Sequence, residues 1–210
     1  MIDLYYRPTA NGLKVGILVE ELGIEHRLVP VNIREGAQQA EAFQRISANG
    51  RIPAIVDQAR GLSLFESGAV LNYLGGALVP DVGTAEYWQV QQWLFWQVGH
   101  VTPYLSQLQV FRERAPEPIP FALEMLQREA ERLYVVLEGA LQAHEYAAGH
   151  HSVADIAIFP WIQPARQGIE LARYPAVAAW RERIKARPAV QRAYARGREV
   201  AAQEKSLVLE

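Results

Sequence analysis

Short apolar segments alternate with polar segments through the first 78 residues. Four segments have the apolar, β-branched or aromatic composition of strands, namely residues 2–7, 26–33, 52–56 and 62–65. Between Asn11 and Glu21 the apolar spacing fits a largely buried helix, with Gly23 at its C-terminal end. A second helix is predicted after Ser67, and the polar stretch 35–47 is expected to be irregular or weakly helical.

The pattern changes after residue 84, where only helical periodicity remains. Residues 85–112 predict a first helix that is rich in tryptophan. Apolar residues then recur at spacings of four, three, four and four and form one stripe, which consists of Leu126, Ala130, Leu133, Leu137 and Leu141. Such a stripe predicts a long amphipathic helix packed in a helical bundle.

Short signals mark the ends of the later helices. Ser152 and Asp155 have the spacing of a capping box directly before an apolar run. Pro160 is expected to kink or interrupt that helix, while Pro175 and Pro188 stand where two C-terminal helices begin.

These patterns predict two domains of different fold class. The order βαβ, a variable segment and then ββα matches a thioredoxin-like α/β unit in residues 1–78. Residues 79–84 form the expected linker, residues 85–203 an all-helical C-terminal domain, and residues 204–210 a loose tail.

The amino-acid composition limits the kinds of chemistry and partners that this chain can have. The 21 basic and 23 acidic residues nearly cancel and form no long single-sign run, so we expect neither nucleic acid nor a membrane as partner. The chain has no cysteine, which excludes disulfides, cysteine metal sites and protein thiol nucleophiles. Any thiol chemistry must therefore use the sulfur of a ligand. No charged leader or bilayer-length apolar stretch is found, and a cytoplasmic location is expected.

The loop between the first strand and the first helix is one candidate site. Backbone N–H groups and the positive end of the helix dipole favour an anion there. Thr9 offers a hydroxyl donor and Asn11 an amide donor, and hydrogen bonds to a thiolate lower its pKa without a base. The alternative makes Thr9 an N-cap and the Asn-Gly pair an ordinary turn.

Two further junctions carry candidate ligand contacts. The Ile52-Pro53 bond is a candidate cis peptide that would expose the backbone of Ile52 to an extended ligand, although a trans edge-strand proline is the more common form. Glu66 and Ser67 lie between a strand and a helix, where a hydroxyl can hold a carboxylate and Glu66 an ammonium group. Together they suit an α-amino acid, and the alternative is a plain helix cap.

A metal site is not expected. His144 and His150 superficially resemble a zinc-protease motif, but that motif needs two histidines four residues apart on one helical face. These two are six apart, and Gly149 interrupts the helix between them. An interhelical turn is the better interpretation.

The chain resembles the glutathione transferase superfamily at several segments in the family's order. LVPVN, RIPAIVD and LFESGAVLNYL reproduce its glutathione-domain pattern, and SVADIA matches its C-terminal capping signature. LYYRPTANGLK, QQWLFWQVG, APEPIPFA and YPAVAAWRERIKARPA look like its bacterial nu class. The resemblance covers nearly the whole chain and implies the glutathione transferase fold and a homodimer.

The resemblance also implies roles for the candidate residues. Thr9 and Asn11 match residues beside the glutathione sulfur, although the family's usual proline between them is Ala10 here. Tyr5 and Tyr6 point to opposite faces of a strand, and both are expected to serve in packing. The matched contacts to the peptide of glutathione are Gln38, Ile52, Pro53, Glu66 and Ser67, and Arg132 matches a contact from the partner subunit.

The expected function is that of a glutathione-dependent thiol–disulfide oxidoreductase or transferase. In this reading the thiolate of bound glutathione attacks a small disulfide or an electrophile, and no protein cysteine takes part. Three alternatives remain open, namely conjugation of glutathione to small electrophiles as the main activity, a non-catalytic binding or regulatory module, and an isomerase or dehalogenase that uses the same thiolate.

Overall fold

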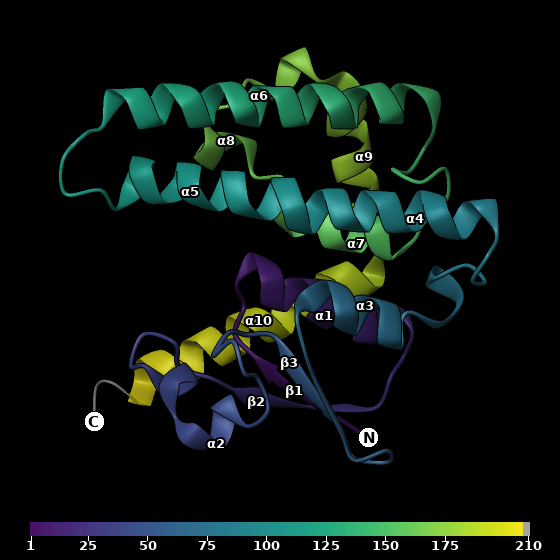
Figure 1. The fold of residues 1–210 in the computed structure, drawn as a ribbon, viewed down its shortest axis with the longest axis vertical. Coiled ribbons are helices and arrows are strands. Elements are labelled where there is room, and N and C mark those ends of the chain that lie inside the picture. Colours follow the sequence, from purple (N-terminus) through teal and green to yellow (C-terminus); the bar gives the residue numbers. More distant parts are fainter. Residues whose placement is uncertain (208–210) are drawn as a thin grey trace. The chain divides into compact units, whose positions relative to one another are not determined.

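The computed structural model describes residues 1–207, with side chains described up to residue 202. Its contacts divide into two compact units, which are described separately (Figure 1). The first comprises Met1–Ala77 together with the chain from Lys185 onward, and the second comprises Leu78–Ile184. No helix within residues 1–207 combines the length and the apolar character needed to cross a bilayer.

The first unit is built on a four-stranded sheet in the order β2-β1-β3-β4. Its strands are β1 (Ile2–Tyr6), β2 (His26–Pro30), β3 (Ala54–Asp57) and β4 (Leu62–Phe65). Helix α1 (Ala10–Glu21) connects the parallel strands β1 and β2, whereas β3 runs antiparallel to both β1 and β4. Helix α3 (Ser67–Leu74) follows β4 and completes the expected thioredoxin-like order.

Short helical turns occupy the segment between β2 and β3. They are η1 (Ala37–Gln39) and α2 (Glu41–Gln44), as expected for a polar and weakly helical stretch. A further turn, η2 (Gly76–Leu78), follows α3 at the end of this part of the chain.

Strand alternation divides the side chains of β1 between two cores. Leu4 and Tyr6 are almost fully buried and pack in one cluster with apolar residues of α1, β3 and α3. Tyr5 points to the other face, where its ring lies 5.8 Å from that of Phe43 in a second cluster.

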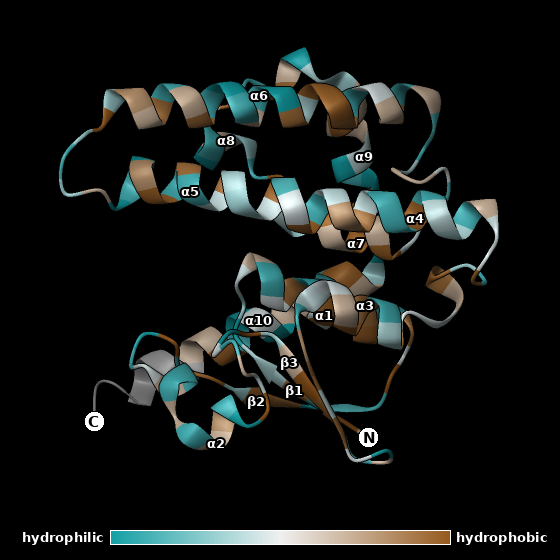
Figure 2. Cartoon of the chain, in the orientation of Figure 1, coloured by the Kyte–Doolittle hydropathy of each residue, from teal (hydrophilic) through white to brown (hydrophobic). Residues whose placement is uncertain are grey.

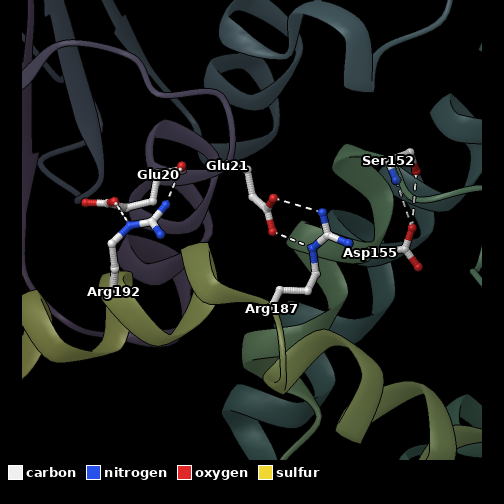
Figure 3. A network of polar contacts seen from close by, with 6 residues as sticks. All are labelled: Glu20, Glu21, Ser152, Asp155, Arg187 and Arg192. Carbon is white, nitrogen blue, oxygen red and sulfur yellow. Dashed lines mark hydrogen bonds and ion pairs between the residues drawn. The ribbon is translucent and has the colours of Figure 1, made fainter.

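Helix α10 (Pro188–Leu207) belongs to this first unit, although the sequence placed its residues in the helical domain. It packs against α1, and Val200 enters the core beneath the sheet. Arg187, directly before α10, donates to Glu21, and Arg192 of α10 donates to Glu20, so basic residues at the start of α10 pair with acidic residues at the end of α1 (Figure 3). The expected tail of 204–210 begins inside α10, and residues 208–210 lie outside the described residues.

The second unit is helical, which confirms the expected fold class of an α/β domain followed by helices. Its longer helices are α4 (Ala85–Trp96), α5 (Thr102–Glu113), α6 (Pro120–Ala143) and α9 (Pro175–Lys185). Shorter elements are η3 (Gln97–Val101), α7 (Val153–Ile158), η4 (Phe159–Trp161), α8 (Pro164–Gln167) and η5 (Leu171–Arg173). The single helix expected over 85–112 is therefore α4 and α5, joined by the wider π-helical turn η3.

Helix α6 shows the predicted stripe most clearly. All five stripe residues are buried, whereas residues on the opposite face are exposed. Hydrophobic and hydrophilic residues consequently alternate along this helix in Figure 2. The amphipathic pattern thus identified both the helix and its buried face.

The capping box at the start of α7 is also confirmed. The Ser152 hydroxyl accepts a hydrogen bond from the backbone of Ala154. The Asp155 carboxylate accepts one from the backbone N–H of Ser152 (Figure 3). Asp155 is fully buried and also accepts from Ala147 N–H at 3.0 Å and from Trp180 Nε1 at 2.9 Å. One carboxylate thereby ties α7 to the preceding loop and to α9.

Candidate active site in the thioredoxin-like unit

The loop before α1 presents a hydroxyl at a helix N-terminus. Thr9 is the N-cap of α1 with extended backbone, and its Oγ1 accepts a hydrogen bond from Gly12 N–H at 3.2 Å. The simpler interpretation of Thr9 as a helix cap is therefore correct. A hydroxyl carries a donor besides its acceptor lone pairs, so capping leaves the Thr9 O–H able to donate to an anion. Asn11 lies in the first turn and is partly exposed.

Gly12 gives this loop its tight geometry. A Cβ at this position would lie against the Arg7 carbonyl group, 3.2 Å from its carbon and closer still to its oxygen. The turn from β1 into α1 can therefore close only around a residue without a side chain. The backbone N–H groups of the first turn are held at the end of β1, where the dipole favours negative charge.

The two tyrosines of β1 are used in packing. Tyr6 is 1% exposed, and burial raises the pKa of its phenol well above its ordinary value. Its ring packs beside Gly16, and its hydroxyl lies against Gly197 of α10. Tyr5 packs against Phe43. Each ring therefore has a neighbour in the core of this unit.

The segment before β3 adopts the rarer of the two expected forms. The Ile52-Pro53 peptide bond is cis, so the trans alternative is wrong. Just before it, Ser47 Oγ donates to the Arg51 carbonyl at 2.9 Å and accepts from the Arg51 N–H at 3.3 Å.

Gln38 reaches the same segment from η1. Gly50 has a left-handed backbone, and a Cβ there would lie 3.4 Å from the Gln38 carbonyl oxygen. The side-chain Oε1 of Gln38 is buried and has no hydrogen-bond partner among the described residues. A buried acceptor of this kind is costly unless another group, such as a ligand donor, satisfies it.

Glu66 and Ser67 begin α3 in a way the sequence did not predict. Glu66, not Ser67, is the N-cap, and its backbone is left-handed with φ 68°. Residues other than glycine seldom adopt that conformation, and such positions cluster at functional sites. Glu66 thus occupies the N-cap position, but its side chain makes no capping hydrogen bond. The Glu66 carboxylate is therefore available for other contacts.

Polar groups from two other segments hold this pair. Asn49 Nδ2 donates to Glu66 Oε1 at 3.2 Å, and Lys14 Nζ of α1 donates to Ser67 Oγ at 3.3 Å. Burial lowers the pKa of the Lys14 ammonium to about 7, while the nearby negative charge of Glu66 opposes that shift. Sequence reasoning missed Lys14, although a charged residue inside the apolar run of α1 was a signal for it.

The predicted site residues are thus distributed unevenly between the units. The first unit contains the residues predicted to touch the ligand, namely Thr9, Asn11, Gln38, Ile52, Pro53, Glu66 and Ser67. Arg132 is in the second unit, exposed on α6, where its guanidinium donates twice to Glu129 at 2.6 and 2.8 Å. Among the side chains that the structure describes, up to residue 202, no three His, Asp or Glu are grouped to hold a metal ion.

Comparison with known proteins agrees with this architecture. The model of the glutathione S-transferase N-terminal domain matches residues 2–76, and that of the C-terminal domain matches residues 115–188. The chain belongs to the glutathione S-transferase family. It is 46% identical over 202 residues to the disulfide-bond oxidoreductase YfcG of Escherichia coli, covering 92% of this chain and 94% of that protein.

Solved structures of glutathione transferases are similar to this chain in three dimensions. A glutathione transferase family member from Pseudomonas fluorescens with two glutathione bound has a TM-score of 0.87 at 35% identity, covering 91% of each chain. Glutathione transferase URE2P8 from Phanerochaete chrysosporium with oxidized glutathione has a TM-score of 0.89 at 27% identity, covering 96% of each chain.

Proposed function

We propose that this protein is a glutathione-dependent thiol–disulfide oxidoreductase that stabilises the thiolate of bound glutathione. The observation that carries the proposal is the Thr9 hydroxyl. Its oxygen is occupied by Gly12 N–H, which leaves the O–H to donate at the positive end of α1. A donor aimed at a sulfur anion lowers the pKa of the thiol, and Asn11 in the same turn supplies a second donor.

The remaining site residues bind the peptide part of glutathione. Glu66 is exposed and receives the α-ammonium group, while Ser67 receives the α-carboxylate. The backbone of Ile52, preceding Pro53, pairs with the cysteinyl residue of the ligand. Gln38 contacts the other end of the tripeptide, where a ligand donor satisfies its unpartnered Oε1.

The chemistry balances without any protein thiol. The glutathione thiolate attacks one sulfur of a small disulfide, the S–S bond breaks, and the departing thiolate takes up a proton. A second glutathione thiolate then attacks the mixed disulfide, giving glutathione disulfide and the second thiol. Two electrons pass from two glutathione molecules to the substrate. The chain has no cysteine, which agrees with this route, and YfcG is named a disulfide-bond oxidoreductase.

The proposal includes nu-class membership, a cytoplasmic location and a homodimer. The cytosol keeps glutathione reduced, as this reaction requires. The dimer is supported by exposed apolar side chains in the second unit, where Trp88 and Phe95 are 62% and 67% exposed one heptad apart on α4. On α6, Phe121 and Met125 are 75% and 44% exposed. Large exposed apolar groups of this kind mark interaction surfaces, and Arg132 of a partner would reach the ligand across such an interface.

The test compares Thr9→Val with Thr9→Ser, because only the second keeps the hydroxyl. With glutathione and a small hydroxyalkyl disulfide, we expect Thr9→Val to lose about 100-fold in kcat/KM, as is typical when one donor to an anion is removed. Thr9→Ser should stay within about threefold of wild type. Asn11→Ala should also lower the rate. Equal rates for Thr9→Val and wild type would refute the role of the hydroxyl.

The same variants distinguish reduction from conjugation. Conjugation to an aromatic halide uses the same thiolate but transfers glutathione to carbon, so both activities should fall together if Thr9 and Asn11 act on the sulfur. A wild type that conjugates the halide and leaves the disulfide intact would make conjugation the main activity. Failure of glutathione to bind by calorimetry would favour the non-catalytic module.

A further inference from the structure

Lys14 is buried in an unusual place. It is 1% exposed, lies between Leu13 and Val15 in α1, and reaches Ser67 across 53 residues of sequence. Burying an ammonium group costs far more free energy than burying an apolar side chain of the same length. A methionine at this position would fill a similar space without that cost. The charge therefore calls for an explanation beyond packing.

The chemistry of the two groups fixes the direction of their hydrogen bond. While Lys14 is protonated, its ammonium has three donors and no acceptor, so Ser67 Oγ accepts in the 3.3 Å contact. A hydroxyl that accepts from one side keeps its single O–H for a group on the other side. Ser67 is 8% exposed and is the first residue of α3, directly after the N-cap Glu66.

We propose that Lys14 is a positioning residue that orients the Ser67 hydroxyl toward the α-carboxylate of the γ-glutamyl group of glutathione. This inference rests on the proposed function and deepens it. The ammonium also places positive charge behind the hydroxyl, where it complements the carboxylate. Glu66 beside Ser67 holds the ammonium of the same amino acid, so two groups of residues in the N-terminal half of α1 act on different parts of one ligand. Thr9 and Asn11 act at the sulfur, and Lys14 acts at the γ-glutamyl group.

The test measures Kd by calorimetry for two ligands, glutathione and an analogue in which 4-aminobutyrate replaces the γ-glutamyl group. The analogue lacks only the α-carboxylate. We expect Lys14→Met to weaken glutathione binding about 10- to 100-fold, the range for losing a hydrogen bond to a charged group. Binding of the analogue should change less than about twofold. Lys185→Met removes an exposed lysine and should alter neither Kd.

Kinetics and a double variant separate positioning from general structural damage. In Lys14→Met the KM for glutathione should rise while kcat at saturation stays within about threefold, because the sulfur contacts are intact. Adding Ser67→Ala to Lys14→Met should cost little more than Ser67→Ala alone, since both substitutions remove one interaction. If Lys14→Met does not fold, Lys14→Gln keeps an N–H donor without the charge and is used with the same two ligands.

Each outcome bears on one conclusion. Equal weakening of both ligands by Lys14→Met or Lys14→Gln means that Lys14 supports the fold, and this overturns the inference. Unchanged glutathione affinity in the variant overturns it as well. Equal affinity of wild type for the two ligands shows that the α-carboxylate is not bound, which overturns the inference while the glutathione function stands. Absence of binding of either ligand to wild type refutes the proposed function itself.

Discussion

Two buried charges, one in each unit, are stabilised in different ways. Asp155 in the second unit accepts hydrogen bonds from Ala147, Ser152 and Trp180, so its carboxylate is satisfied by the loop and helices around it. Lys14 in the first unit donates to Ser67, a side chain of the predicted ligand site. The Asp155 carboxylate connects structural elements of the second unit, whereas the Lys14 ammonium contacts a residue of the predicted ligand site. Removing the Asp155 carboxylate should therefore lower the free energy of unfolding, and removing the Lys14 ammonium should weaken glutathione binding.

The largest expected effect is loss of the carboxylate in the second unit. Asp155→Ala leaves the Ala147 N–H and the Trp180 Nε1–H buried without partners, and we expect the free energy of unfolding to fall by about 4 kcal/mol. Urea denaturation followed by tryptophan fluorescence measures this loss. Asp155→Asn keeps one acceptor oxygen and should lose less. Glu124→Ala removes an exposed ion pair with Arg128 and should change stability by less than about 0.5 kcal/mol.

A smaller loss of stability combined with a loss of binding should follow from Gly12→Ala in the first unit. The added methyl group collides with the Arg7 carbonyl and forces the turn that carries Thr9 and Asn11 to move. We expect a cost of about 2 kcal/mol, typical of overpacking, and glutathione binding weakened at least tenfold. Calorimetry and urea denaturation on the same sample separate the two effects.

A matched glycine in the second unit provides the control. A Cβ at Gly139 of α6 meets no described atom within 4 Å, so Gly139→Ala should raise stability by about 0.5 to 1 kcal/mol through helix propensity. Its glutathione affinity should equal that of wild type. Equal binding by Gly12→Ala and Gly139→Ala would contradict the assignment of the loop as a ligand site.

The sequence predicted best where the signal is local. The capping box of Ser152 and the proline starts of α9 and α10 depend on residues within one turn, and they are found where expected. The features that the sequence did not predict depend on contacts between segments that are distant along the chain. The cis form of Ile52-Pro53 and the left-handed Glu66 each depend on chain that folds against them. The docking of α10 on α1 likewise depends on Gly197 fitting beside Tyr6, which no local pattern reveals.

The last comparison concerns how pH changes the cost of the Lys14 charge. An unfolded lysine titrates near pH 10.4, whereas burial lowers the pKa of Lys14 in the folded protein to about 7. Below pH 7 both states hold the proton, and the full cost of burying it opposes folding. Above pH 7 the folded state releases its proton first, so stability should rise with pH by on the order of 1 kcal/mol per pH unit.

The comparison with Lys14→Met isolates this contribution, because every other titrating group is shared. Urea denaturation of both proteins at about pH 7, 8 and 9 should show the stability difference shifting steadily in favour of wild type. Burial raises the pKa of Asp155, so its contribution has the opposite sign and weakens the fold as pH rises through the acidic range. Parallel pH profiles for wild type and Lys14→Met would show that Lys14 keeps its proton through this range, because its partners then compensate the cost of burying its charge.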